Sequence, residues 1–224
     1  MTKKLAFVHT VPSIVELFAR LAKELLPPDV EALHIADEIL LKVVLEQGGL
    51  NPGVYRRVAE HVIAAEAAGA TVVQLTCSSI SPCADAARQM VAIPVLTIDE
   101  PMVDKALGLG TCIGVAATAP TTLKPTVDLI RTRAEAMGKQ VQVESVLCQD
   151  AYTALLSGHP EKHDAIVRDT IRDLQRRTDV VLLAQASMAQ ALDGLPVEPQ
   201  ATPVLSSPRL AVERARAVLA ATAG

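Results

Sequence analysis

Aromatic residues are nearly absent from this chain. Its 224 residues include no Trp, two Phe and two Tyr, although half of the residues are hydrophobic. The core must therefore be built from Val, Leu, Ile and Ala. The net charge is −4, and no basic cluster or set of aromatic side chains is present on which bases could stack. The sequence therefore does not predict a nucleic-acid-binding protein.

Long apolar runs are also missing, and we expect no signal peptide. No apolar stretch reaches the ~20 residues of a membrane span, and the start, MTKKLAFVHTVPS, turns polar too early for a signal peptide. The cysteines, at positions 77, 83, 112 and 148, form neither a C-x-x-C pair nor a Cys/His cluster with zinc spacing. We therefore expect a cytoplasmic protein with reduced thiols, no metal site and no membrane contact.

Apolar segments of strand length alternate with segments of helical length. The expected strands are 5–10, 30–36, 71–76, 93–98, 112–117, 141–147, 179–184 and 203–205. The expected helices are 12–26, 52–68, a short one opened by Ser81-Pro82 and ending at Met90, one from about 101, 121–137, 161–177 and 208–221. Residues 37–50 look less regular. Strands separated by helices predict an α/β protein with parallel sheets.

The second half of the chain repeats the first. VHTVPS (8–13) is similar to AATAPT (116–121), and VVQLTCSSIS (72–81) is similar to VVLLAQASMA (180–189); both pairs are offset by 108 residues. A third pair, IPVLTIDEP and TPVLSSPRL, is offset by 109. A nearly constant offset over three separate segments indicates an internal duplication.

The duplication predicts two pseudo-symmetric α/β lobes, residues 1–107 and 108–224, with the C-terminal helix 208–224 free to pack back on the first lobe. Ligands of open parallel sheets bind beyond the carboxyl ends of the strands. We therefore expect an active-site cleft between the lobes, lined by the repeated strand ends.

Cys77 lies at one of these strand ends, in the motif LTCSS. A structural cysteine would lie inside the apolar run, whereas Cys77 follows its last residue, Thr76. Nearby N–H groups and the following helix can lower the pKa of a thiol at such a position and make it reactive. The equivalent position in the second half is Gln185, in the motif LLAQASMA.

These two motifs, together with the paired loops HTVPS and AATAPTT, resemble those of the aspartate/glutamate racemase superfamily, and the resemblance spans essentially the whole chain. That superfamily includes hydantoin and allantoin racemases, maleate isomerase and arylmalonate decarboxylase. The resemblance implies a cofactor-independent enzyme that moves a proton at the carbon alpha to a carboxylate, with one thiol from each lobe. Gln185 departs from this pattern, because an amide carries no proton at neutral pH.

The resemblance assigns catalytic positions to Cys77 and Gln185. It implies that the substrate is bound by small polar groups, because these motifs contain no Arg or Lys. The expected substrate-binding residues are His9, Thr10, Ser78, Ser79, Thr118, Thr121 and Ser187.

Three functions remain open. The first is an amino-acid racemase-like isomerase with Cys77 as its single thiol and a second group that is not cysteine, for which His9 is a candidate. The second is a decarboxylase or lyase in which the thiol protonates one face of the substrate. The third is a non-catalytic protein that binds a small carboxylate. The expected partner is a small carboxylate in each case, and a homo-oligomer such as a dimer is left open.

Several of these residues also have a purely structural explanation. Thr10 and Thr118 can cap helices. His9 can be a buried polar residue at a strand end. Asp37 and Glu38 can contact a substrate amine, but a solvated loop is the simpler expectation for them.

Overall fold

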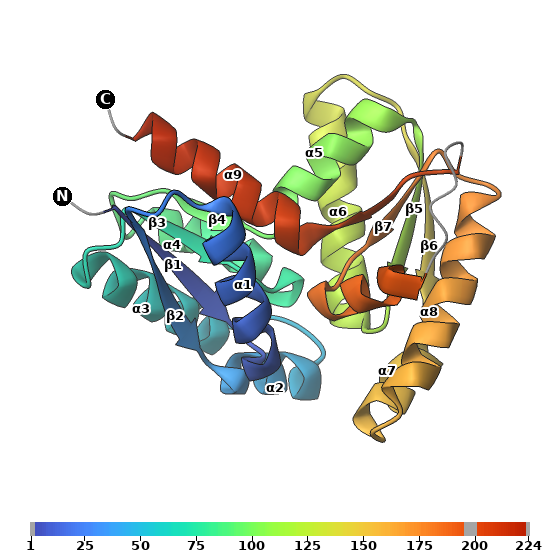
Figure 1. Ribbon diagram of the computed structural model, residues 1–224, viewed down its shortest axis with the longest axis horizontal. Helices are drawn as coiled ribbons and strands as arrows, with labels where there is room; N and C mark the ends of the chain where they lie inside the picture. Colours follow the sequence, from blue (N-terminus) through green and yellow to red (C-terminus); the bar gives the residue numbers. More distant parts are fainter. Residues whose placement is uncertain (1–2, 195–200, 223–224) are drawn as a thin grey trace. The chain divides into compact units, whose positions relative to one another are not determined.

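The computed structural model describes residues 3–194 and 201–222, which form two compact units (Figure 1). One unit comprises Met1–Ile98 and Pro208–Gly224, and the other comprises Asp99–Ser207. Each contains a four-stranded parallel sheet flanked by helices, as the repeat predicts. Within the described ranges, no helix is long and apolar enough to cross a membrane.

The sheet of the first unit has the strand order β2-β1-β3-β4. Its strands are β1 (Lys3–His9), β2 (Val30–Ala36), β3 (Val72–Leu75) and β4 (Val95–Thr97). Its helices are η1 (Pro12–Ile14), α1 (Val15–Leu25), α2 (Glu38–Gln47), α3 (Pro52–Ala67), η2 (Ser78–Cys83), α4 (Ala84–Arg88) and α9 (Ser207–Ala221). Because side chains alternate along a strand, β1 directs Ala6 and Val8 into the core formed with α2, α3 and α4. Its other face carries Phe7, which packs on Phe18 of α1 with ring centroids 5.4 Å apart.

The sheet of the second unit has the equivalent order, β6-β5-β7-β8. Its strands are β5 (Cys112–Ala117), β6 (Gln142–Leu147), β7 (Val180–Leu183) and β8 (Val204–Ser206). Its helices are α5 (Glu100–Leu109), α6 (Pro120–Ala136), α7 (Gln149–Leu156), α8 (Pro160–Gln175) and η3 (Ala186–Gly194). Val167 and Ile171 of α8 join the core around Leu183. Helices α5 and α6 are linked by an ion pair in which Arg133 Nε donates to Asp104 Oδ1 at 2.8 Å.

The strand register reproduces the offset of the sequence repeat. Val8 lies opposite Leu75 in the first sheet, and Ala116 lies opposite Leu183 in the second, so both members differ by 108 residues. At the last strand, Val95 lies opposite Val73 and Val204 lies opposite Val181, which gives the offset of 109 seen in the third sequence pair. The repeated segments therefore occupy equivalent positions in two equivalent sheets.

In each half of the repeat, the helix that follows the last strand belongs to the unit formed mainly by the other half. Helix α5 follows β4 but belongs to the second unit, and α9 follows β8 but belongs to the first. Arg209 of α9 forms an ion pair with Glu24 of α1, and Lys3 donates to the carbonyl of Leu219. The sequence-based boundary after residue 107 therefore lies inside α5.

Two helical segments were not predicted, and the start of a third, the short helix now seen as α4, was placed too early. Helix α2 occupies most of the stretch expected to be irregular, and it ends at Gly48 in the left-handed conformation (φ 69°). Helix α7 precedes the predicted helix at α8. Ser81-Pro82 does not begin a helix, because both residues lie inside the 3₁₀ helix η2. The Ser81 hydroxyl donates to the carbonyl of Cys77 at 3.3 Å instead of capping a helix.

The expectation that Asp37 lies in a solvated loop is wrong. Asp37 is 7% exposed and caps α2 by accepting the N–H of Ile39 at 3.1 Å. Its carboxylate also accepts from Arg57 Nη2 at 3.2 Å and from His61 Nε2 at 2.6 Å. Burial raises the pKa of Asp37, but the hydrogen bonds from Arg57 and His61 outweigh burial, so this pKa lies below its ordinary value. Asp37 therefore joins α2 to α3.

We predict that Asp37→Ala lowers the free energy of unfolding by about 2 kcal/mol, because it removes a helix cap and leaves Arg57 and His61 without the carboxylate that both contact. Asp169→Ala is the control. The exposed carboxylate of Asp169 pairs with Arg172 on the same helix, so this substitution should change stability by less than about 0.5 kcal/mol. Urea denaturation measures both variants. Equal losses would show that the Asp37 cluster contributes no more than a surface ion pair.

Candidate functional site

The ends of β1 and β3 lie side by side in the first unit. The Thr76 N–H and hydroxyl both donate to the carbonyl of Val8, each at 3.0 Å. The loops that begin at Thr10 and Cys77 therefore start from neighbouring points on the carboxyl edge of one sheet, where the sequence placed them.

Cys77 connects β3 to η2 and is half-buried. Its backbone is extended (φ −138°, ψ 122°), and its carbonyl accepts the N–H of Ile80 at 3.1 Å. One side of the residue packs against the apolar core of the first unit. The predicted substrate-binding residues Ser78 and Ser79 follow as the first residues of η2, and both are buried.

The other three cysteines have pKa values above the ordinary thiol value. Burial raises the pKa of Cys83 to about 12, with a smaller contribution from the charge of Cys77. Burial also raises the pKa of Cys148 and, together with the carboxylates of Asp179 and Glu144, that of Cys112. These thiols are therefore poor nucleophiles and poor bases at neutral pH.

Thr10 carries a buried hydroxyl without a hydrogen-bond partner in the described parts of the chain. The residue is 1% exposed, and its Oγ1 is unpaired. The helix-capping explanation is wrong here, because η1 is preceded by Val11 and has no side-chain cap. A buried polar group without a partner costs about 1–3 kcal/mol, so the open hydroxyl at this strand end is a candidate ligand contact.

The equivalent threonine of the second unit is fully paired. The N–H of Thr118 donates to Gln185 Oε1 at 2.5 Å, and the hydroxyl of Thr118 donates to the same atom at 2.9 Å. Helix capping is wrong here too, because α6 is preceded by Ala119 and has no side-chain cap. The structure thus joins the predicted residues Thr118 and Gln185 directly.

Thr121 and Ser187 lie near this pair in the sequence of the second unit. Thr121 is in the first turn of α6 and Ser187 is in η3, and both are half-buried. The structure therefore gathers the predicted residues in two groups, one at the strand ends of each unit. Their convergence on a single cleft stays a prediction.

His9 lies in a hydrogen-bond chain that the sequence analysis missed. Its Nδ1 is 2.8 Å from Thr76 Oγ1, and its Nε2 is 2.9 Å from His34 Nδ1. Because the Thr76 hydroxyl donates to Val8, it accepts from His9 Nδ1–H, and His9 Nε2 must then accept from His34. The two imidazole rings stack with centroids 5.2 Å apart.

The surroundings of His9 in this hydrogen-bond chain keep its imidazole neutral. Burial, followed by the charge of His34, lowers the pKa of His9 from 6.5 to about 4. A proton on His9 Nε2 would also face the N–H of His34, so that two donors would oppose each other. Since both ring nitrogens already have partners, the observed contacts hold the ends of β1, β2 and β3 together. A substrate contact by His9 stays a prediction.

We predict that the free energy of unfolding falls by about 2 kcal/mol between pH 7 and pH 5 through His9 alone. The folded-state pKa is the lower one, so in this range the unfolded chain binds a proton that the folded protein does not, and stability is lost as the pH falls. Urea denaturation at both pH values tests this, with His9→Asn expected to lose correspondingly less over the interval. An NMR titration of His9 with a midpoint near 6.5 would contradict the lowered pKa of its imidazole.

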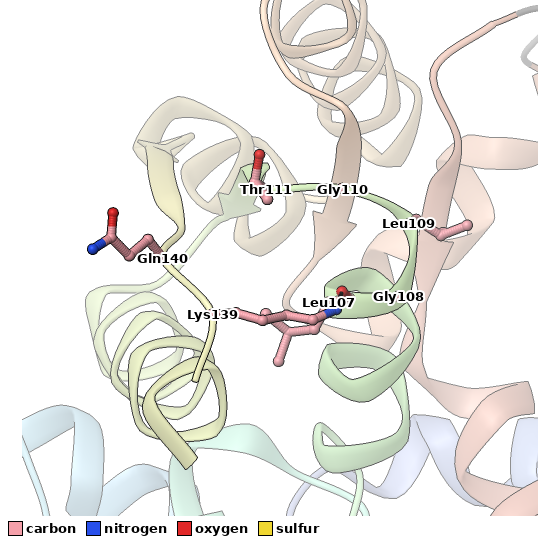
Figure 2. Close-up of a pocket in the computed structure, with 7 residues that line it drawn as sticks. All are labelled: Leu107, Gly108, Leu109, Gly110, Thr111, Lys139 and Gln140. Atoms are coloured by element: carbon pink, nitrogen blue, oxygen red, sulfur yellow. Dashed lines mark hydrogen bonds between the residues drawn. The ribbon is translucent and has the colours of Figure 1, made fainter. Parts of the chain in front are cut away.

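Two cavities among the described residues lie away from these strand ends. One, of about 280 Å³, is at the amino end of β5 and is lined by Leu107, Gly108, Leu109, Gly110, Thr111, Lys139 and Gln140. Figure 2 shows Lys139 lying along the end of α5, where its Nζ donates to the carbonyl of Leu107 at 2.5 Å. The other, of about 240 Å³, lies between α2 and α3 and includes Arg56, Arg57 and Glu60 in its lining. Neither cavity is lined by a predicted site residue.

Metal ligation finds no support within the part of the chain that the structure describes. No group of three or more His, Cys, Asp or Glu side chains is arranged there to hold an ion. The predicted site residues offer a thiol, an imidazole, hydroxyl groups and an amide.

Two equivalent parallel α/β units with polar loops at their carboxyl edges define a duplicated α/β protein. A model of the Asp/Glu/hydantoin racemase family matches residues 9–215, so the chain belongs to this family. Family membership supports a racemase-type enzyme. No curated protein sequence matches the chain.

Solved structures share the fold over nearly the whole chain. Glutamate racemase from Francisella tularensis, in complex with D-glutamate, has a TM-score of 0.72 at 13% identity and covers 99% of this chain and 82% of its own. An aspartate racemase homologue from Pyrococcus horikoshii has a TM-score of 0.69 at 16% identity, covering 98% and 100%. Allantoin racemase from Klebsiella pneumoniae has a TM-score of 0.68 at 16% identity, covering 98% and 89%.

We predict different effects on stability for the same substitution in the two threonine loops. Thr10→Val removes an unpaired hydroxyl and should leave the free energy of unfolding unchanged or raise it by up to about 1 kcal/mol, whereas Thr118→Val removes a hydrogen bond to Gln185 and should lower it by about 1 kcal/mol. Urea denaturation of the two variants provides the comparison, with each serving as the control for the other. A loss at Thr10 as large as that at Thr118 would mean that its hydroxyl is paired.

Proposed function

We propose that this protein is a cofactor-independent racemase or isomerase that acts at the carbon alpha to the carboxylate of an amino acid or related small acid, with Cys77 as its acid/base group. The observation that supports the proposal is the position of Cys77. It is half-buried on the carboxyl edge of β3, beside the loop that holds the unpaired Thr10 hydroxyl.

The proposed reaction begins when the Cys77 thiolate takes the alpha proton and becomes a thiol. The electron pair of the broken C–H bond moves onto the carboxylate, which becomes an enolate. The Thr10 hydroxyl, with donors from Ser78 and Ser79, stabilises the charge that develops on its oxygens. Inversion is completed when water donates a proton to the opposite face of the planar intermediate, and the hydroxide that remains takes the proton of the Cys77 thiol and regenerates the thiolate.

A second candidate function follows from the contact of Gln185. Its amide is bonded to Thr118 and cannot supply a proton, so the position that would hold a second thiol contains no proton carrier. A decarboxylase requires only one. There the C–C bond to a leaving carboxylate breaks, carbon dioxide departs with no electrons from that bond, and the Cys77 thiol protonates the carbon that retains the pair.

We predict that Cys77→Ala lowers the rate of the reaction by ~10²–10⁴-fold, the usual contribution of a positioned proton-transfer group. The assay is a panel of small carboxylic acids incubated in D₂O, with NMR recording deuterium at the alpha carbon and chiral chromatography recording inversion. The control is Cys83→Ala, which removes the neighbouring buried thiol and should retain activity.

The outcomes separate the candidate functions. Exchange with inversion supports the racemase, and release of carbon dioxide with deuterium on one face supports the decarboxylase. Binding of an acid without either reaction supports a carboxylate-binding protein. Full activity of Cys77→Ala would exclude Cys77 from the chemistry.

A further inference from the structure

The hydrogen-bond donors of Thr118 are already paired with an acceptor in the same unit. The N–H and the hydroxyl of Thr118 both donate to Gln185 Oε1. A backbone N–H can donate only to an acceptor, so the oxygen of the amide must face Thr118 and the NH₂ group must face away from it. Within the described residues, that NH₂ group makes no hydrogen bond.

The equivalent loop of the first unit is open. The Thr10 hydroxyl is buried and has no partner among the described residues, and the residue that corresponds to Gln185 is Cys77. A thiol is only a weak acceptor. The two copies of the loop therefore differ in whether another side chain accepts a hydrogen bond from the threonine hydroxyl.

We propose that Gln185 is a specificity-determining residue, because it fills the Thr118 donors that would otherwise accept a carboxylate and offers a neutral NH₂ group in their place. The substrate end recognised by this loop is then a neutral carbonyl or amide oxygen. This inference rests on the proposed function and narrows its substrate class to acids that do not place a second carboxylate at Thr118.

The discrimination has a physical basis in the cost of desolvation. A carboxylate that leaves water needs strong donors in return, and a neutral carbonyl needs fewer. The motifs of this loop contain no Arg or Lys, so an anion there depends on small polar donors such as the Thr118 N–H and hydroxyl, just ahead of the N-terminus of α6. A carboxylate can reach them only by displacing Gln185 and breaking two hydrogen bonds. A carbonyl oxygen can accept from the NH₂ group without displacing anything.

The test uses succinate and succinamate, which differ only in whether the second end is a carboxylate or a carboxamide. Both are titrated into ¹⁵N-labelled protein while the Thr118 amide and the Gln185 side-chain NH₂ signals are followed by NMR. In the unchanged protein, succinamate should shift the Gln185 NH₂ signals and succinate should leave the Thr118 amide in place. Gln185→Ala should free the Thr118 donors, so that succinate shifts the Thr118 amide and binds about tenfold more tightly.

Gln185→Glu provides a second variant of nearly the same shape. Its carboxylate should keep the Thr118 donors filled and repel an anion, so succinate should bind more weakly than to the unchanged protein. Circular dichroism confirms that both variants are folded. The proposal is overturned if succinate shifts the Thr118 amide equally in the unchanged protein and in Gln185→Ala, or if its affinity is the same in both. Because these readouts are binding signals, they do not depend on whether a reaction occurs or on whether Cys77→Ala stays active. Failure of the proposed reaction is therefore distinguished from failure of this inference.

Discussion

Parallel pairing of β1 with β3, and of β5 with β7, determines where the candidate chemistry lies. Parallel strands run in one direction, so the residues that follow them emerge at one edge of the sheet. Val8 opposite Leu75 brings Thr10 and Cys77 to that edge in the first unit. The same register at Ala116 and Leu183 is what allows the side chain of Gln185 to reach Thr118 in the second unit.

The architecture could be predicted because the duplication preserved strand spacing. An offset of 108 residues in the sequence became the same offset in the strand register. The unpredicted helices are short segments, and short helices depend more on packing than on local propensity. Helix α2 is an example, since it is capped by Asp37, whose carboxylate is held by Arg57 and His61 from α3. That contact joins positions 20 and 24 residues apart, which a local sequence pattern does not show.

The candidate site was predictable as a set of positions but not as a set of contacts. The sequence located Thr10, Cys77, Thr118 and Gln185 at strand ends because that requires only the strand boundaries. Which donor meets which acceptor depends on side-chain rotamers and on segments that are far apart in the sequence. Thr118 and Gln185, for example, are 67 residues apart. His34 could have been found, because the β1–β2 register places it beside Phe7 and on the face that carries His9. His9 was predicted as a substrate-binding residue from its strand-end position alone. The structure shows that it belongs to a buried hydrogen-bond chain with Thr76 and His34.

The two loops also show how a duplicated fold can divide stability and binding between its copies. An unpaired buried hydroxyl costs about 1–3 kcal/mol, and the first unit bears that cost at Thr10. The second unit avoids it, because Gln185 supplies an oxygen to both donors of Thr118. A loop whose hydrogen-bond donors are paired within the protein is more stable. It is also less available to an anion, since the anion must displace the side chain that already accepts from those donors. Under the proposed function, the difference between cysteine and glutamine at this repeated position changes the number of proton carriers, and it also determines whether the threonine hydroxyl of the loop is open to a substrate acid.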